Sequence, residues 1–377
     1  MLRKVLGFTL ALIFSNSVLG KEVKKMIVVG ERVIENNPWR NDLIKRQYQI
    51  AIDQALLEHK AKHPNSKLQI VTSFDEGPAN GFSLAEKLGA LGVAGYLYSS
   101  EAFEASQIAQ NKKIPYLSPV SPLNSIRNDF SYSLAASHQD LTRSFTKLNQ
   151  RLNLPSVIAA PETQLPNFEY SRVYKEAFNV VGNYQGKTSL VWDGLTKDLP
   201  KLTATGPINL LFAGFAFEQM DLAQTISSSS FAEKINMVAH AQWGYSIRLL
   251  EDSLPNSVPN FYVVTDCFNP SVLAEQGFGS NDLEMERFKK LKAVIEKEPV
   301  LKGQSICEPI IFSLKDMISI ALEAGERSQN REDFNRVYSS VDYRGACGNY
   351  KVRDKKSERN VYLGKWEGKK LKPIATL

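Results

Sequence analysis

Residues 93–125 read VAGYLYSSEAFEASQIAQNKKIPYLSPVSPLNS, and this stretch decides the fold. A short apolar run leads into the hydroxyl pair Ser99 and Ser100, and a helical pattern then covers residues 101–113. A second apolar run begins at Ile114 and ends in another hydroxyl-rich turn. The pattern predicts two parallel strands joined by a helix. Small ligands bind at the carboxyl ends of such strands in open α/β sheets.

The same alternation of strand and helix patterns extends in both directions. Towards the amino terminus, residues 25–30 and 68–71 have the pattern of buried strands, and the helical pattern between them ends at His63-Pro64. Beyond residue 155 the alternation restarts, with strand-like runs at residues 156–160, 188–191, 208–212, 235–238 and 261–265. We therefore predict an α/β fold with mostly parallel sheets flanked by helices, and the restart indicates two such units.

The length of 377 residues suits two domains. Near the carboxyl terminus, apolar and polar residues alternate at residues 349–352 and 360–366, with charged residues between the two runs. This alternation predicts a β-hairpin.

The chain begins with a segment typical of secretory signal peptides. Arg3 and Lys4 provide a basic start, an apolar run covers residues 5–14, and small residues precede the expected cleavage site after Gly20. The apolar run is too short to span a bilayer as a helix. We therefore expect residues 1–20 to be removed and the soluble mature chain to be exported to the periplasm.

The charge balance is mildly basic. The chain has 46 Lys and Arg residues against 40 Asp and Glu residues, which gives a formal net charge of +6. Loss of Arg3 and Lys4 with the signal peptide would lower it by two, to +4, and much of the remaining excess lies in residues 351–372. Because the sequence lacks interleaved aromatic and basic residues, we expect a solvated basic face and no nucleic-acid partner.

The cysteines and histidines give few signals of chemistry. Cys267, Cys307 and Cys347 allow one disulfide in an oxidising compartment and leave one thiol. His59 and His63 are four residues apart on a predicted helix, a spacing that can bind a metal ion. No carboxylate of the HExxH type accompanies them, so we expect a solvated helix end and no metal site.

The sequence carries none of the common catalytic signatures. It contains no GxGxxG after a strand, no GxxxxGK[ST] and no GxSxG. We therefore expect a protein that is not an enzyme and that has no cofactor.

Four segments, in order along the chain, resemble the type I periplasmic binding proteins, and in particular the leucine/isoleucine/valine-binding group that serves ABC importers. Residues 95–100, GYLYSS, are similar to the strand and Ser-rich turn of that family, and residues 114–119, IPYLSP, to its (V/I)P-x-(I/L)-(S/T)-P strand. Residues 344–352, RGACGNYKV, resemble its late x-G-x-x-G-x-x-x-F element, and residues 361–366 its closing hairpin.

The resemblance implies two lobes joined by three crossovers, with a ligand enclosed between them and hinge closure as the motion. The crossovers would fall near residues 130–136, 261–267 and 341–345. Lobe 1 would then comprise residues 21–134 and 268–340, and lobe 2 residues 135–267 and 341–377. Cys267 stands where the chain returns to lobe 1 and Cys307 lies in the returning segment, and we expect them to pair. Cys347 is the alternative partner of Cys267, because both follow crossovers.

The resemblance also implies ligand-binding positions. In the first lobe these are Trp39 as an aromatic wall, Ser99 with Ser100 for a ligand carboxylate, and the turn containing Val120 and Ser121. The family has a small residue and a Thr in that turn, at positions that match Val120 and Pro122 here, and Pro has neither a hydroxyl nor an N–H.

In the second lobe the matching positions are Phe215, Gln242 and Trp243. The family acid that pairs with a ligand ammonium falls near Gln242, and a neutral amide cannot supply that charge. Because a buried ammonium without a counter-charge is costly, an ordinary α-amino acid is a poor fit.

The sequence is compatible with three functions. The first is a monomeric solute-binding protein that encloses a small polar ligand, such as an amino acid or amide, for the membrane components of an ABC importer. The second is a ligand sensor or envelope interaction module on the same fold, which the loss of the Thr and acid positions favours. The third is an enzyme, which the missing motifs disfavour.

Overall fold

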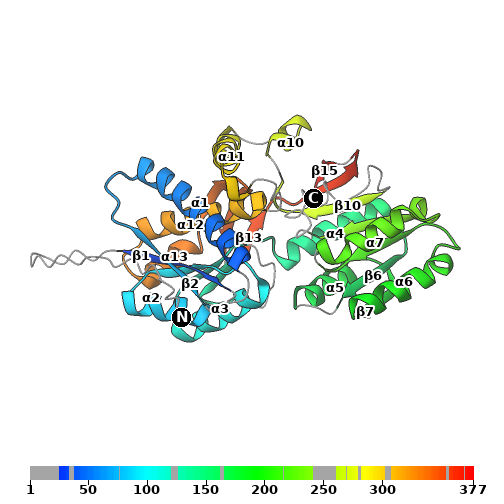
Figure 1. Ribbon diagram of the computed structural model, residues 1–377, viewed down its shortest axis with the longest axis horizontal. Coiled ribbons are helices and arrows are strands. Elements are labelled where there is room, and N and C mark those ends of the chain that lie inside the picture. Colours follow the sequence, from blue (N-terminus) through cyan, green and yellow to red (C-terminus); the bar gives the residue numbers. More distant parts are fainter. Residues whose placement is uncertain are drawn as a thin grey trace, which may run out of the picture.

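The computed structural model describes residues 25–33, 38–75, 77–119, 126–161, 165–214, 216–240, 260–268, 270–278, 282–301, 307–353, 356–368 and 370–377. Two α/β lobes lie side by side and are joined in the middle of the molecule (Figure 1). The predicted signal peptide, residues 1–20, lies outside the described residues. Within the described part of the chain, no helix has the length and hydrophobicity needed to cross a membrane.

The first lobe is built on a five-stranded sheet of order β2-β1-β3-β4-β5, and its strand pairs are parallel. Its strands are β1 (Met26–Arg32), β2 (Gln69–Asp75), β3 (Gly92–Gly95), β4 (Tyr116–Ser118) and β5 (Ser131–Ser133). The interior strand β1 is buried on both faces, with Val28 opposite Val71 on one side and Val93 on the other. A continuous apolar run suits a strand that is covered on both faces.

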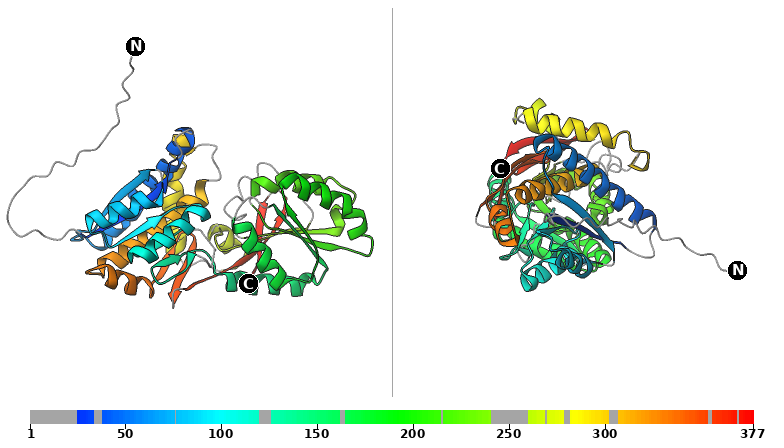
Figure 2. Two further views of the ribbon diagram at one scale, coloured as in Figure 1. Left: turned by 90° about the horizontal axis from the view of Figure 1, so that it is seen from below. Right: turned by 90° about the vertical axis from the view of Figure 1, so that its left-hand side faces the viewer.

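Helices cover both faces of this sheet, as two views of the ribbon show (Figure 2). They are α1 (Pro38–Lys62), α2 (Pro78–Leu88), α3 (Ser99–Lys112), α11 (Asp282–Ile295), α12 (Cys307–Glu326), α13 (Arg331–Tyr338) and the 3-10 helix η3 (Pro299–Leu301). The core on one face is formed with α2 and α3, through residues such as Phe82 and Ala105. The other core is formed with α1 and α12, through residues such as Tyr48 and Ile318.

The second lobe is built on a seven-stranded sheet of order β15-β14-β10-β9-β8-β6-β7. Its strands are β6 (Ser156–Pro161), β7 (Val180–Gly186), β8 (Ile208–Phe212), β9 (Ile235–Ala239), β10 (Phe261–Thr265), β14 (Tyr362–Glu367) and β15 (Lys370–Thr376). The strands from β7 to β10 pair in parallel, and the β14–β15 hairpin adds to β10 in the antiparallel direction. The mixed sheet agrees with the predicted fold class.

Helices also cover both faces of the second sheet. They are α4 (His138–Leu152), α5 (Leu165–Ala177), α6 (Thr188–Leu202), α7 (Ala216–Ser227), α10 (Pro270–Glu275) and the 3-10 helix η2 (Ala232–Lys234). We predicted a strand at residues 188–191, and this was wrong, because these residues begin α6. Val191, Leu195 and Leu199 are buried at helical spacing. The strand is β7, just before them, and its half-exposed residues alternate with exposed ones, which gives a weak hydrophobic signal.

A third, antiparallel sheet contains β11 (Asp342–Gly345), β12 (Gly348–Arg353) and β13 (Lys356–Arg359). Tyr343, Tyr350 and Val352 pack in the core of the first lobe. Our assignment of residues 341–377 to the second lobe therefore fails for its first part, since the chain joins the second sheet only at β14. The predicted hairpin of residues 349–352 with 360–366 was also wrong, because the two runs belong to different sheets. Alternation of apolar and polar residues predicts a strand but does not predict which strand it pairs with.

The cores also locate the other two crossings. Leu134 packs in the first lobe and Ala136 in the second. Leu273 packs in the second lobe and Phe288 in the first, so the return to the first lobe falls after α10 instead of at residue 268. Three crossings thus connect the lobes, and two of them lie later in the sequence than predicted.

Candidate functional site

The carboxyl ends of both parallel sheets lie on the side of the crossings. Strand β5 ends at Ser133 and leads directly into the first crossing. Strand β10 ends at Thr265, next to Cys267, which packs in the core of the first lobe. Since parallel strands end at one edge of a sheet, each lobe presents its carboxyl edge towards the joint, where α/β sheets bind ligands.

The loop after β3 has a demanding backbone. Gly95 has a φ of +132°, and a Cβ there would lie 2.0 Å from the carbonyl oxygen of Gly30. The amide of Tyr96 donates to the same carbonyl at 3.1 Å, and Tyr96 itself has a φ of 60°. This close approach places the end of β3 directly against β1 and sets the position of the turn that follows.

Ser99 is the first residue of α3, so this helix begins two residues earlier than the sequence pattern predicted. The Ser99 residue is 8% exposed and Ser100 is exposed. Tyr98 caps the helix without a side-chain hydrogen bond to its first turn. The first N–H groups of a helix have no intrahelical acceptor and carry partial positive charge, so this start offers donors suited to an anionic group.

A buried carboxylate, that of Glu31, holds the β3–α3 loop in position. Glu31 accepts hydrogen bonds from the hydroxyl of Tyr48 at 2.6 Å, the amide of Leu97 at 2.8 Å and the amide of Arg32 at 3.0 Å. Burial raises the pKa of Glu31, and a side-chain hydrogen bond with Glu101 opposes that rise. The carboxylate therefore ties the β3–α3 loop to β1 and α1. Sequence reasoning missed Glu31, although an acid at the end of an apolar strand run was a visible signal.

In the second lobe, His240 follows β9 at the same kind of edge. Its Nε2 lies 2.6 Å from the carbonyl oxygen of Gly214, and its ring stacks on Tyr170 at 3.6 Å between centroids. Burial lowers the pKa of His240 to about 3, so the ring is neutral at pH 7 and Nε2–H donates to the carbonyl. His240 thus joins the ends of β8 and β9. Sequence analysis gave this histidine no role.

Among the predicted ligand-binding residues, the structure places Ser99 and Ser100 together at the carboxyl edge of the first lobe. Trp39 is the second residue of α1, and its side chain lies outside the described part. The remaining predicted positions also lie outside the described residues; they are Val120, Ser121, Phe215, Gln242 and Trp243. Phe215 directly follows Gly214, and Gln242 comes two residues after His240.

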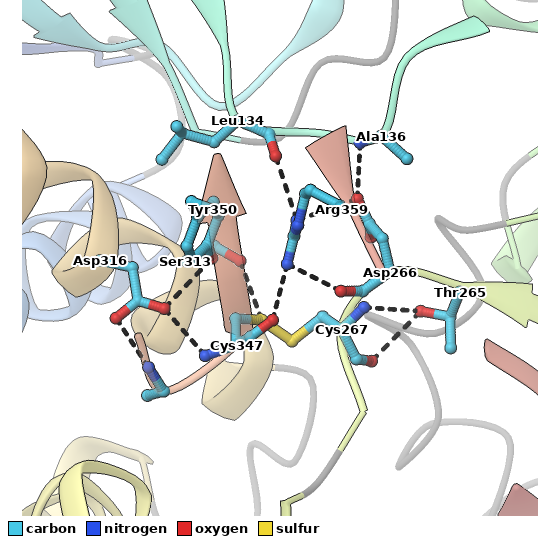
Figure 3. The surroundings of a disulfide bond; sticks show 11 residues. Leu134, Ala136, Thr265, Asp266, Cys267, Ser313, Asp316, Cys347, Tyr350 and Arg359 are labelled. Carbon is cyan, nitrogen blue, oxygen red and sulfur yellow. Dashed lines mark hydrogen bonds and ion pairs between the residues drawn. A yellow bond between two sulfur atoms is a disulfide. The ribbon is translucent and has the colours of Figure 1, made fainter. Parts of the chain in front are cut away.

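Arg359 links all three chain segments at the joint (Figure 3). Its guanidinium donates to the carbonyl oxygen of Leu134 at 3.1 Å, to the carboxylate of Asp266 at 2.9 Å and to the carbonyl oxygen of Cys347 at 2.6 Å. The same carboxylate accepts from the amide of Ala136 at 2.7 Å. The side chains of Arg359 and Asp266 are each 1% exposed. One buried ion pair therefore holds the crossing strands together.

A disulfide reinforces this joint, and it joins Cys267 to Cys347 with a Cα–Cα distance of 4.9 Å. The expected pair Cys267–Cys307 was wrong, and the alternative partner Cys347 is the one found. We expected Cys267 to pair within the segment that returns to lobe 1, whereas the fold brings the end of β10 next to the β11–β12 turn. Cys267 follows β10, and Cys347 lies in the β11–β12 turn beside Arg359 (Figure 3).

Asp316 of α12 fixes that turn from the first lobe. Its carboxylate accepts from the amides of Ala346 and Cys347, each at 2.8 Å, and from the hydroxyl of Tyr350 at 3.1 Å. A Cβ at Gly345 would lie 2.1 Å from the carboxylate, so this position needs glycine. Cys347 is thus held in position for Cys267 by contacts that only the folded lobe provides.

No family model matches the sequence, and no curated protein matches it significantly. Solved structures do match over nearly the whole chain. The leucine-binding protein LivK of Thermotoga maritima is 15% identical, with a TM-score of 0.69 over 94% of this chain and 98% of that one. LivJ of Streptococcus pneumoniae, a branched-chain amino acid transporter substrate-binding protein in complex with isoleucine, is 11% identical with a TM-score of 0.70, over 94% of this chain and all of that one.

A solute-binding protein of an ABC transporter from Rhodopseudomonas palustris, in complex with p-hydroxybenzoic acid, is 15% identical with a TM-score of 0.69. It is covered over 97% of its length by 94% of this chain. The fold is therefore that of the type I periplasmic binding proteins, as the resemblance predicted. At these identities the likeness establishes the fold, and the function needs its own argument.

Proposed function

We propose that this protein is an exported solute-binding protein that encloses a small carboxylate-bearing ligand between its two lobes and delivers it to an ABC importer. The observation that carries the proposal is the buried Ser99 at the start of α3, on the edge of the sheet that lies towards the joint. The similar solved structures are substrate-binding proteins, and the proposed role involves no catalysis.

A carboxylate is the group that the ligands of the similar proteins share. Isoleucine and p-hydroxybenzoic acid, seen in two of those structures, differ in every other feature. The hydroxyls of Ser99 and Ser100 and the first N–H groups of α3 are donors, and helix N-termini favour anions. The bracing of Leu97 by Glu31 would hold these donors in place for the ligand.

A residue of the second lobe further restricts the chemical class of the ligand. Gln242 stands near the position of the acid that pairs with an amino-acid ammonium in the resembling family. A neutral amide can hydrogen-bond a hydroxyl or carbonyl but cannot neutralise a buried cation. The proposed ligand is therefore a small acid without a free ammonium, such as an aromatic acid, with Trp39 as an aromatic wall.

A thermal-shift screen against aromatic acids, aliphatic acids, amino acids and amides tests this proposal. Acids without an ammonium are expected to raise the melting temperature, and Ser99→Ala is expected to weaken their binding by about 1–3 kcal/mol if it leaves a charged group unpaired. Ser106→Ala is the matched control, because Ser106 is also buried on α3 and its hydroxyl donates to the carbonyl oxygen of Phe103 in the same helix.

Equal affinity in the Ser99→Ala and Ser106→Ala variants would place the ligand elsewhere. Gln242→Glu gives a second arm. It is expected to weaken binding of a ligand that lacks an ammonium. A gain in affinity for leucine would instead support an α-amino acid as the ligand.

A sensor or envelope interaction module is the second candidate. Pro122 and Gln242 stand where the resembling family has a Thr and an acid, and their loss fits a protein that no longer delivers amino acids. Native mass spectrometry of gently purified protein separates the candidates, since a retained small molecule supports transport or sensing. Absence of any small molecule supports the interaction module.

Export to the periplasm is part of the proposal and rests on the signal-like residues 1–20. Cell fractionation is expected to find a processed, monomeric chain in the periplasm. Recovery of the unprocessed chain in the cytoplasm would contradict it.

A further inference from the structure

A cluster of histidines and carboxylates lies at the end of the first lobe opposite the proposed ligand site. Helix α1 ends at Lys62, with His59 in its last turn and His63 directly after it. Helix α12 ends at Glu326, with Glu323 one turn earlier. Lys25, which precedes β1, donates to the carbonyl oxygen of Glu326 at 3.4 Å. The cluster therefore lies near the amino edge of the sheet, and a role for it does not depend on the proposed function.

Three potential ligand groups converge there. A ring nitrogen of His59, a ring nitrogen of His63 and a carboxylate oxygen of Glu323 all lie within 4.8 Å of one another. The two rings are 4.8 Å apart between centroids. The Nε2 of His63 is 3.6 Å from the Glu323 carboxylate, and this buried nitrogen has no hydrogen-bond partner. Small side-chain movements would bring all three donors to one ion.

A second carboxylate orients His59 from behind. The Nε2 of His59 lies 3.3 Å from the carboxylate of Glu326 and 3.0 Å from the hydroxyl of Ser66, and that hydroxyl donates to the same carboxylate. Because a carboxylate only accepts, Nε2 of the neutral ring carries the hydrogen and Nδ1 keeps its lone pair. The Nδ1 atom is buried and has no hydrogen-bond partner. A carboxylate behind the second nitrogen is the usual support of a metal-bound histidine.

The charges at this end also favour a cation. Glu323 and Glu326 lie in the last turns of α12, where the negative end of the helix dipole opposes carboxylates, and the last turn of α12 has no basic residue. Lys62 now pairs with Glu323 at 2.7 Å, and its exposed side chain can turn into solvent.

We propose that His59, His63 and Glu323 bind a divalent transition-metal ion such as Zn²⁺, with Glu326 as the positioning residue of His59. Two imidazoles and one carboxylate suit Zn²⁺ and its neighbours in the first transition row, whereas Mg²⁺ and Ca²⁺ select oxygen ligands. The ion would join the ends of α1 and α12. The i, i+4 histidines were visible in the sequence, and we expected a solvated helix end because no carboxylate of the HExxH type accompanies them. The carboxylates that lie beside them come about 260 residues later in the chain, and His59 is buried.

Titration calorimetry on the untagged, chelator-treated full chain with ZnCl₂ tests the site, with melting curves recorded in Zn²⁺ and in Mg²⁺. We expect one Zn²⁺ per chain, a higher melting temperature in Zn²⁺ and no such rise in Mg²⁺. His63→Ala and Glu323→Gln should each weaken Zn²⁺ binding by about tenfold or more. Both positions are partly exposed, so folding is expected to persist, and circular dichroism of each variant checks it.

His138→Ala is the matched control. Its Nε2 lies 3.0 Å from the carboxylate of Glu176 in the second lobe, so it is also a buried histidine beside a glutamate, but it lacks a second histidine. This variant should bind Zn²⁺ as the parent does. Absence of stoichiometric binding, or equal affinity in His63→Ala, Glu323→Gln and the parent, would overturn the proposal. A larger stabilisation by Mg²⁺ than by Zn²⁺ would overturn it as well.

Discussion

Asp266 at the joint and Glu31 at the edge of the first lobe are both fully buried carboxylates, but the protein compensates them differently. Asp266 lies against the guanidinium of Arg359, whose charge persists at any physiological pH. The hydrogen bonds to Glu31 come from a hydroxyl and two backbone amides, with Glu101 as a further carboxyl neighbour.

The difference teaches how each region is stabilised. A buried carboxylate paired with a guanidinium is stabilised by the opposite charge, and removing one partner leaves the other buried and unpaired, which is costly. A buried carboxylate with neutral donors has a raised pKa, so its stability contribution depends on pH. The joint should therefore respond strongly to loss of a charge, and the edge should respond to protonation.

Arg359→Met is expected to have the largest effect. It leaves Asp266 buried without its cation, which typically costs about 3–5 kcal/mol of unfolding free energy. Urea denaturation followed by circular dichroism measures the loss. Arg336→Ala, which removes a strongly exposed ion pair with Asp333, is the control and should cost less than about 1 kcal/mol. Similar losses of unfolding free energy in the two variants would show that the ion pair at the joint is no more important for stability than one at the surface.

Loss of the disulfide should come next. The double variant Cys267→Ala/Cys347→Ala opens a bridge between residues separated by 80 positions and is expected to cost roughly 2–4 kcal/mol. Denaturation of the oxidised protein provides the comparison, and Cys307→Ala is the control. Non-reducing peptide mapping should find Cys307 free, and a Cys267–Cys307 peptide would contradict the structure.

Glu31→Gln tests the pH dependence at the edge. Burial raises the pKa of Glu31, so the folded protein holds the proton to higher pH than the unfolded chain does. The stabilisation is fully present below the ordinary pKa of 4.5 and is lost as the pH rises through the raised pKa. Glutamine has the shape of the protonated acid, so the variant should lose less stability than the parent between pH 4.5 and pH 8. Parallel stability curves would show that Glu31 does not titrate differently on folding.

Tyr48→Phe should have the smallest effect. It removes the hydroxyl that donates to Glu31 at 2.6 Å but keeps the buried ring, so a loss of about 1 kcal/mol is expected. Thermal denaturation of the variant and the parent measures the loss. A loss above about 3 kcal/mol would mean that Glu31 is charged and depends chiefly on the Tyr48 hydroxyl.

Much of the fold could be predicted from local patterns. The apolar runs at residues 25–30 and 93–95 and the helix that ends before His63 are present, because burial on both faces requires continuous apolar strands. Ser99 was also visible, since a hydroxyl turn follows the strand directly. Edge strand β7 was misplaced, because a half-exposed strand has too little apolar pattern to be recognised.

The sequence by itself thus determined the two α/β units, their parallel sheets and the Ser99 turn, because each depends on residues close together in the chain. Only the tertiary structure decided that Cys267 pairs with Cys347, that Arg359 bonds to Leu134, Asp266 and Cys347, and that Glu323 comes beside His59. These contacts join residues that are far apart in sequence. Local periodicity has no information on them, because they form only when the packing of complete lobes fixes where each distant segment lies.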